Sequence, residues 1–157
     1  MKILVISDSH GHIANLKHVL GFGQKIGVKA VIHCGDWDDL PSFDTALSFG
    51  IPIYSVQGNA DVNADLLEAL PYECKKFDSH LLRLNIDGRR IGIIHRVKKD
   101  DKFENLDIVF SGHYHSKDSR MIDFLKFIRP GALINGNNFA VYETANNEVT
   151  IIEDTNS

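Results

Sequence analysis

Five short segments of the sequence carry aspartate, asparagine and histidine residues directly after apolar runs. They are Asp8-Ser9-His10, Gly35-Asp36, Gly58-Asn59, His95 and Gly112-His113-Tyr114-His115. If each apolar run is a strand, these segments lie at carboxyl ends of strands, where open α/β sheets bind their ligands. Carboxylate, amide and imidazole donors without a thiolate suit manganese, iron, nickel or zinc. The sequence therefore predicts a divalent metal site built from distant segments.

The number of candidate ligands favours two ions over one. The side chains exceed what a four-coordinate catalytic zinc uses, and one carboxylate can bridge two ions about 3.5–4 Å apart. Each residue alone has a simpler interpretation: Asp8 or Asp36 as a turn or capping residue, Asn59 as a tight-turn residue, and His95 as a strand end. Their joint occurrence favours metal binding.

The first half of the chain has the pattern of an α/β fold. Residues 3–6 and 30–32 are apolar runs, and residues 12–26 between them repeat apolar residues at helical spacing. This predicts a βαβ unit with parallel strands. A weaker helical stretch follows Pro41, a strand is expected at 51–56, and a short helix is expected at 63–70, closed by Pro71.

The second half has the pattern of β-structure. Residues 81–86 alternate, Asp87-Gly88 is a strong hairpin turn, and residues 91–94 return as the partner strand. Further strands are expected at 107–110, 121–128, 139–143 and 149–152. No repeat or linker interrupts the chain, so both halves are expected to share one core, with two stacked sheets flanked by helices.

In order and spacing, the five segments resemble the motif blocks of calcineurin-like metallophosphoesterases, in particular their compact prokaryotic phosphodiesterase branch. The resemblance implies an α/β (α+β) fold, a four-layer αββα sandwich of two stacked mixed sheets flanked by helices, in a single domain of residues 1–157. It further implies a first ion held by Asp8, His10 and His115 and a second held by Asn59, His95 and His113. Asp36 would bridge the two.

The function expected from this resemblance is hydrolysis of a phosphate ester, with phosphodiesters favoured over monoesters. The expected mechanism is in-line attack of a hydroxide that bridges two divalent ions of manganese, nickel, iron or zinc. Asp36, Asn59 and His113 are the expected catalytic residues. The alternative is a non-catalytic scaffold for protein interactions, because the retromer's phosphoesterase-like subunit has this fold and lacks part of the ligand set. The complete ligand set favours the enzyme, since crowded carboxylates and imidazoles without metal cost stability.

Two positions depart from the family pattern. Ala60 follows Asn59 where relatives often carry a His that protonates the leaving group, or in this branch a Cys. Arg96 follows His95 where the family usually has Gly, and it could grip a phosphate or lie on the solvated surface. His12, at the start of a predicted helix, is a candidate for the missing proton donor or an exposed residue. Trp37 and Tyr114 could stack on a substrate or simply pack.

The composition gives few signs of a large partner. The chain has 17 basic and 21 acidic residues and a formal net charge of -4, so no obligate nucleic-acid or membrane partner is indicated. The opening apolar run is too short for a membrane span or signal peptide, and the two cysteines lack a metal-binding spacing. We expect a cytoplasmic protein that acts on a small phosphoester, and family analogy suggests a homo-oligomer.

Overall fold

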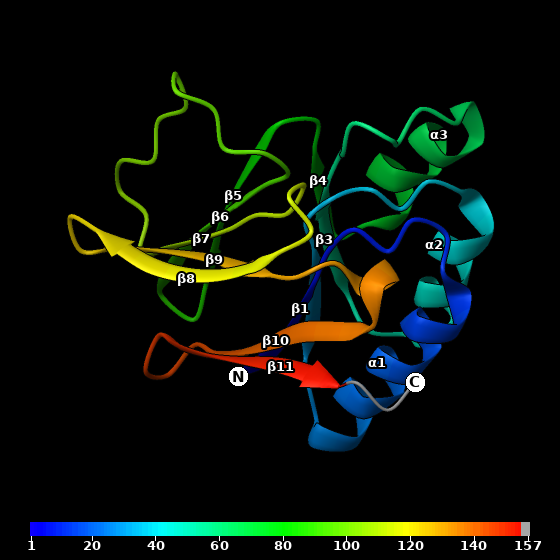
Figure 1. The fold of residues 1–157 in the computed structure, drawn as a ribbon, viewed down its shortest axis with the longest axis horizontal. Helices are drawn as coiled ribbons and strands as arrows, with labels where there is room; N and C mark the ends of the chain where they lie inside the picture. The colour runs from blue at the N-terminus through cyan, green and yellow to red at the C-terminus, as the bar shows by residue number, and fades with distance from the viewer. Residues whose placement is uncertain (155–157) are drawn as a thin grey trace.

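The computed structural model describes residues 1–154 and contains two mixed β-sheets and three α-helices (Figure 1). In spatial order, sheet A consists of β11 (Glu148–Asp154), β10 (Asn137–Glu143), β1 (Lys2–Ile6), β2 (Ala30–His33), β3 (Ile53–Val56) and β4 (Lys76–Asp78). Sheet B consists of β5 (Leu81–Ile86), β6 (Arg89–Ile94), β7 (Ile108–Phe110), β9 (Leu125–Pro130) and β8 (Lys117–Ile122).

Sheet A is covered on one face by α1 (Ile13–Ile26), α2 (Leu40–Leu47) and α3 (Ala64–Glu73). The strands β1 to β4 are parallel neighbours, and their apolar runs are buried because helices cover one face and sheet B the other. Each helix begins at a side-chain cap, supplied by His12, Asp39 and Asn63. The predicted βαβ unit is confirmed.

Sheet B packs one face against sheet A and leaves much of the other exposed. In β5, Leu82 and Leu84 are buried while Arg83 and Asn85 are exposed, as the alternating pattern predicts. The hydrophobic core between the sheets includes residues from both halves of the chain, such as Ile3 of β1 and Phe110 of β7. The two halves thus share a core.

The layers follow one another as helices, sheet A and sheet B (Figure 1). The predicted α/β class, with two stacked mixed sheets flanked by helices, is confirmed. All three helices lie on sheet A, and no helix covers the outer face of sheet B within residues 1–154. The structure therefore shows three layers where the resemblance implied four. The connection from β6 to β7, residues 95–107, crosses as a loop without a helix.

Several boundaries differ from the sequence prediction. The strand expected at 121–128 is the hairpin of β8 and β9, whose turn residues Asp123 and Phe124 both have positive φ, at 50° and 71°. That turn lacks the glycine or asparagine that usually signals such a geometry. The helix expected to end before Pro71 continues to Glu73, because the Cys74 N–H donates to the Leu70 carbonyl and closes the last turn. The strand β4 was not predicted.

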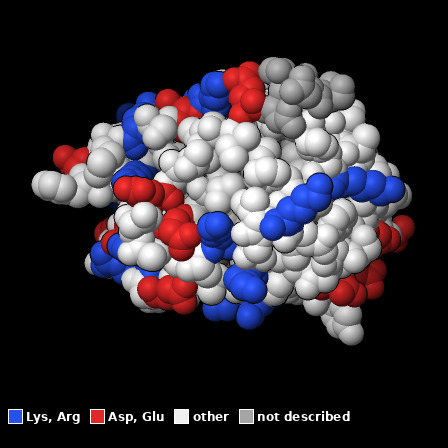
Figure 2. All heavy atoms as spheres, turned by 90° about the horizontal axis from the view of Figure 1, so that it is seen from below, with Lys and Arg blue, Asp and Glu red and all other residues white. Residues whose placement is uncertain are grey.

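Charged side chains of both signs lie on the face of the molecule shown in Figure 2, and in several places basic and acidic side chains adjoin each other. A band of lysine and arginine side chains crosses one part of that face. Among residues 1–154, none of the helices combines the length and the apolar character needed to cross a membrane.

Candidate metal centre

The five predicted segments end at one edge of the stacked sheets. Asp8, Asp36 and Asn59 follow the parallel strands β1, β2 and β3 of sheet A. His95 and His113 follow the parallel strands β6 and β7 of sheet B. Because parallel strands direct their carboxyl ends the same way, the loops of each sheet lie together. The structure brings all seven predicted side chains into one group.

The first cluster consists of Asp8, His10 and His115. The Nε2 atoms of the two histidines lie 3.1 Å apart, and they are 3.8 and 3.5 Å from Asp8 Oδ1. Asp8 Oδ2 accepts hydrogen bonds from Ser7 Oγ at 2.6 Å and from the His113 N–H at 3.0 Å. One carboxylate oxygen is thus fixed by the scaffold while the other points at the two imidazoles.

The second cluster consists of Asn59, His95 and His113. Asn59 Oδ1 lies 2.8 Å from His95 Nε2 and 3.0 Å from His113 Nδ1, and these two nitrogens are 3.3 Å apart. His95 Nδ1 lies 2.8 Å from the buried carbonyl of Cys34, to which it donates its proton. In a neutral ring this hydrogen bond leaves Nε2 unprotonated and directed at the cluster.

Asp36 lies between the two clusters. Its Oδ2 is 3.2 Å from His95 Nε2 and 3.5 Å from His10 Nε2, while Oδ1 accepts a hydrogen bond of 2.8 Å from the Ala60 N–H. Burial opposes ionisation of this carboxyl, but a hydrogen bond from His95 in its protonated form and the hydrogen bond from the Ala60 N–H outweigh it and lower its pKa to about 2. Asp36 therefore carries its negative charge at neutral pH.

The donor atoms fit divalent cations. Asp8 Oδ1 is buried and has no hydrogen-bond partner among residues 1–154, although an orphaned carboxylate oxygen is costly. The ligand atoms of Asp8, His10 and His115 all lie within 4.8 Å of one another, as do those of Asp8, Asp36 and His95. Oxygen and imidazole donors in this number are chemically suited to borderline transition metals. A bound cation would give Asp8 Oδ1 a partner and would offset the repulsion between the grouped carboxylate oxygens and imidazole nitrogens.

Backbone strain is concentrated in the same loops. Positive φ angles are uncommon outside glycine and tend to occur where a functional site imposes them. Five of the seven predicted ligands have them: Asp8 (52°), His10 (44°), Asp36 (69°), His113 (74°) and His115 (60°). The loops are therefore bent to aim these side chains inward.

Two glycines allow the loops to approach closely. A Cβ atom at Gly58 would lie 2.1 Å from Asp36 Oδ1, and one at Gly112 would lie 2.0 Å from Ser7 Oγ. Neither distance is compatible with a side chain. The glycines that precede Asn59 and His113 in the sequence are thus required by the site geometry.

Two supporting carboxylates, Asp38 and Asp61, were not predicted from the sequence. Both oxygens of Asp38 lie 3.0 Å from His10 Nδ1, so Asp38 orients the imidazole and directs its Nε2 toward the first cluster. The buried Asp61 accepts hydrogen bonds from the N–H groups of Asp36, Asp38 and Gly58 at 2.8–2.9 Å. The run of acids after Gly35 was the available signal for Asp38, whereas Asp61 had none.

The buried side chains of His33 and Trp37 support the loops that carry Asp8 and Asp36. The Gly35 N–H donates to His33 Nδ1 at 3.1 Å, so a neutral ring carries its proton on Nε2 and donates it to Ser9 Oγ at 2.9 Å. Complete burial lowers the pKa of His33 well below its usual value. Trp37 stacks on this ring with centroids 3.7 Å apart and is fully buried. Trp37 is therefore a packing residue, one of the two interpretations left open for it.

The other predicted candidates lie at the rim or outside it. His12 caps α1, accepting a hydrogen bond from the Asn15 N–H, and its role as a proton donor stays a prediction. Arg96 Nε donates to Tyr114 Oη at 3.3 Å, which places its guanidinium beside the second cluster. Tyr114 is half exposed. Ala60 contributes its backbone N–H to Asp36 and has no acidic proton on its side chain.

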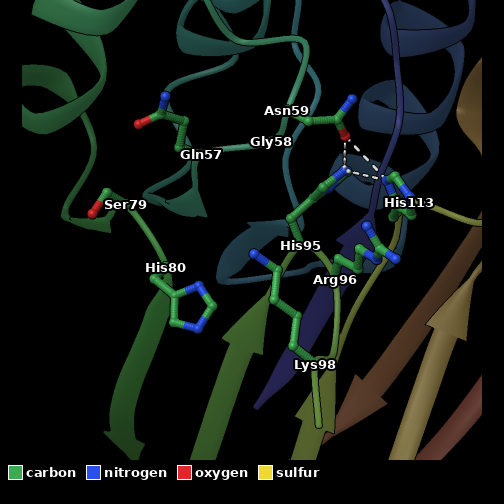
Figure 3. Close-up of a pocket in the computed structure, with 9 residues that line it drawn as sticks. All are labelled: Gln57, Gly58, Asn59, Ser79, His80, His95, Arg96, Lys98 and His113. Carbon is green, nitrogen blue, oxygen red and sulfur yellow. Dashed lines mark hydrogen bonds between the residues drawn. The ribbon is translucent and has the colours of Figure 1, made fainter. Parts of the chain in front are cut away.

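A pocket of about 270 Å³ opens beside the second cluster (Figure 3). It is lined by Gln57, Gly58, Asn59, Ser79, His80, His95, Arg96, Lys98 and His113. All three members of the second cluster line it, whereas Asp8, His10 and His115 do not. The metal-ligand candidates of the second cluster therefore form one wall of a space large enough for a small ligand.

The fold and the grouped side chains define a class of protein. The family model of the calcineurin-like phosphoesterase superfamily domain matches residues 1–147. This chain belongs to that superfamily.

Individual relatives agree with the assignment. The chain is 25% identical over 138 residues to phosphodiesterase MJ0936 of Methanocaldococcus jannaschii, covering 83% of each protein. A solved structure described as a novel archaeal phosphodiesterase superposes with a TM-score of 0.84 at 24% identity, covering 98% of this chain and 99% of the other. Zinc-complexed Vps29 of Entamoeba histolytica gives 0.67 at 20% identity, covering 96% and 90%. These two structural matches support the fold.

Proposed function

We propose that the protein is a dinuclear metal-dependent phosphodiesterase that hydrolyses a small phosphoester. The observation that carries the proposal is the buried Asp8 Oδ1, which has no partner among residues 1–154 and faces two imidazoles. Membership of the phosphoesterase superfamily and the likeness to phosphodiesterase MJ0936 support the reaction class.

The residues would divide between two ions. Asp8, His10 and His115 would hold one, Asn59, His95 and His113 the other, and Asp36 would contact both, since it lies within 3.5 Å of a histidine from each cluster. Manganese, nickel, iron and zinc suit these donors. Two such ions would activate water as a nucleophile and polarise the phosphoryl oxygens.

The protein's own groups orient the donors and the substrate. Asp38 and the Cys34 carbonyl fix the tautomers of His10 and His95, so that both rings present Nε2 to the centre. Asn59 and His113 form the wall between the centre and the pocket, where they can contact a bound phosphoryl group. Ala60 supplies no proton, so the leaving group would depart as an anion or take its proton from solvent or another residue.

A non-catalytic scaffold is the second candidate, and the structural likeness to Vps29 is its support. The seven grouped side chains and their supporting carboxylates argue against it, because they cost stability unless they hold cations. A cytoplasmic location and a homo-oligomeric state stay predictions.

The test is hydrolysis of bis(p-nitrophenyl) phosphate by purified protein supplied with manganese or nickel. We expect turnover that a chelator abolishes and that added metal restores. Absence of turnover with either metal, or turnover that survives chelation, would contradict the proposal. The variant Asp65→Asn on the exposed start of α3 provides a matched control for the handling of carboxylate variants.

A further inference from the structure

The pocket beside the second cluster, called the cationic pocket below, has an unusual lining. Among its nine lining residues there is no apolar side chain and no carboxylate. Beyond the second cluster, it presents two basic side chains, Arg96 and Lys98, together with the imidazole of His80. Such walls favour a compact anion over a nucleobase or an aryl group, which bind in apolar or aromatic surroundings.

The two cations are free to meet a ligand. Among residues 1–154, neither Arg96 nor Lys98 forms an ion pair with a carboxylate. The guanidinium of Arg96 lies next to His113, whereas the amino group of Lys98 points toward the space between His80 and His95 (Figure 3). Arg96 Nε donates a hydrogen bond to the Tyr114 hydroxyl, and the guanidinium of Arg129 lies over the Tyr114 ring, 5.2 Å from its centroid. The cations therefore flank the second cluster from two sides.

The nearby carboxylate of Asp101 has a structural role. One oxygen of Asp101 lies 2.5 Å from His80 Nε2, and the other accepts the Lys98 N–H at 2.6 Å. Asp101 thereby fastens the turn that carries Lys98 to the ring of His80 and does not itself line the pocket. The carboxylate of Asp101 thus fixes the position of His80 relative to the backbone of Lys98.

The missing proton donor narrows the class of leaving group. An alkoxide needs a proton when it departs, and Ala60 provides none beside Asn59. A phosphate leaving group is a stable anion near neutral pH and needs charge stabilisation instead, which two cations beside the second cluster can supply. The absence of a proton donor at Ala60 and the two basic side chains of the pocket both favour a substrate whose leaving group is a phosphate.

We propose that the cationic pocket binds the terminal phosphate of a phosphoanhydride, so that the substrates are small diphosphate esters cleaved at the P–O–P bridge. Water adds to the phosphorus that carries the ester group, the bond from that phosphorus to the bridging oxygen breaks, and the electron pair leaves on the terminal phosphate. The products are a phosphate monoester and inorganic phosphate, which take up one proton of the water, while the other goes to solvent. This inference rests on the proposed function.

The test compares two substrates that share the attacked phosphorus. Thymidine 5′-diphosphate has phosphate as its leaving group, and the p-nitrophenyl ester of thymidine 5′-monophosphate has nitrophenolate. The ratio of kcat/KM for the diphosphate to kcat/KM for the nitrophenyl ester is measured for the wild type, Arg96→Gln, Lys98→Gln and Lys99→Gln. Lys99 is the matched control, because it is exposed and does not line the pocket.

We expect the wild type to cleave both substrates. The ratio should fall about tenfold or more in Arg96→Gln and Lys98→Gln, because the free energy of a hydrogen bond to a charged group corresponds to a factor of this size. It should stay constant in Lys99→Gln. Cleavage of the nitrophenyl ester without the diphosphate, or a constant ratio in all variants, would overturn the inference and leave the proposed function standing. If the protein cleaves neither substrate, both the inference and the proposed function are overturned.

Binding gives a second measurement that does not depend on turnover. The α,β-methylene analogue of thymidine 5′-diphosphate cannot be cleaved at the bridge, and its dissociation constant is measured by calorimetry on manganese-loaded protein. We expect weakening of about tenfold in Lys98→Gln and none in Lys99→Gln. Equal affinities in all three proteins would show that the terminal phosphate binds elsewhere.

Discussion

The two clusters of the metal centre differ in charge and in what lies behind them. The first contains the carboxylate of Asp8, and its His10 is backed by a second carboxylate, Asp38. The second contains the neutral amide of Asn59, its His95 is backed by a backbone carbonyl, and it faces the cationic pocket. More negative charge favours tighter cation binding. We therefore expect the first cluster to retain its ion and the second to exchange its ion and meet the substrate.

The largest effect is expected at Asp36, which both clusters share. Asp36→Asn removes the charge between them and should nearly abolish turnover, more than Asp8→Asn, because it weakens both ions and raises the pKa of a water bound between them. The measurement is kcat on bis(p-nitrophenyl) phosphate with metal content determined alongside. Equal losses in both variants, with a lower Tm of metal-free Asp36→Asn, would assign Asp36 to the fold.

The next largest effect concerns proton donation on the substrate side. Ala60→His places an imidazole beside Asn59, and a positioned acid contributes about 10²–10⁴-fold. The gain should appear for alkyl phosphodiesters, whose leaving groups need a proton, and hardly at all for nitrophenyl esters. The measurement is kcat against leaving-group pKa for both proteins. A shallow dependence in the wild type that His12→Ala makes steep would identify His12 as the donor, whereas equal gains for all esters would contradict the missing-donor account.

A smaller effect should separate the two clusters directly. Asp38→Asn leaves His10 in place but removes the carboxylate that orients its ring, and loss of such an outer partner costs about 10–100-fold in metal affinity. Titration of metal-free protein with manganese should show that the tighter of two sites has weakened. Asp65→Asn, exposed on α3, serves as control. Weakening confined to the looser site would reverse the assignment of the clusters.

The smallest effect is on stability and tests the support common to both clusters. His33 stays neutral in the folded state because burial lowers its pKa, whereas an unfolded histidine takes up a proton below about pH 6.5. The unfolded state then binds more protons, so the free energy of unfolding falls as the pH drops, by at most about 1.4 kcal/mol per pH unit for this group. His33→Gln should flatten that slope between pH 7 and 5 in chemical denaturation of metal-free protein. An unchanged slope would show that His33 does not carry it.

The sequence predicted the elements whose signals are local. The buried runs of β1 and β2 and the helical spacing of α1 gave the parallel unit, and Asp87-Gly88 gave the hairpin of β5 and β6. The turn at Asp123 and Phe124 was missed because Phe124 stands at the position where such a turn usually has glycine. The pairing of β8 with β9, in which Ile122 lies opposite Leu125, fixes that turn.

The site divides in the same way. The seven grouped side chains could be predicted because each follows a strand, whose carboxyl end fixes where the loop lies. Asp61 could not, since its three backbone contacts exist only after the loops have met. The roles of His80 and Lys98 could not be predicted either, because the pocket that they line forms only where the segments after β3, β4, β6 and β7 meet.

Metal stoichiometry tests the central claim most directly. Purified protein is stripped with a chelator, reloaded with manganese and freed of excess metal, and its metal content is determined by elemental analysis together with a calorimetric titration. We expect two ions per chain that bind with unequal affinity in the wild type, and in Asp36→Asn either one ion per chain or a marked weakening of both. A saturated wild-type protein that binds no more than one ion per chain would contradict the dinuclear centre.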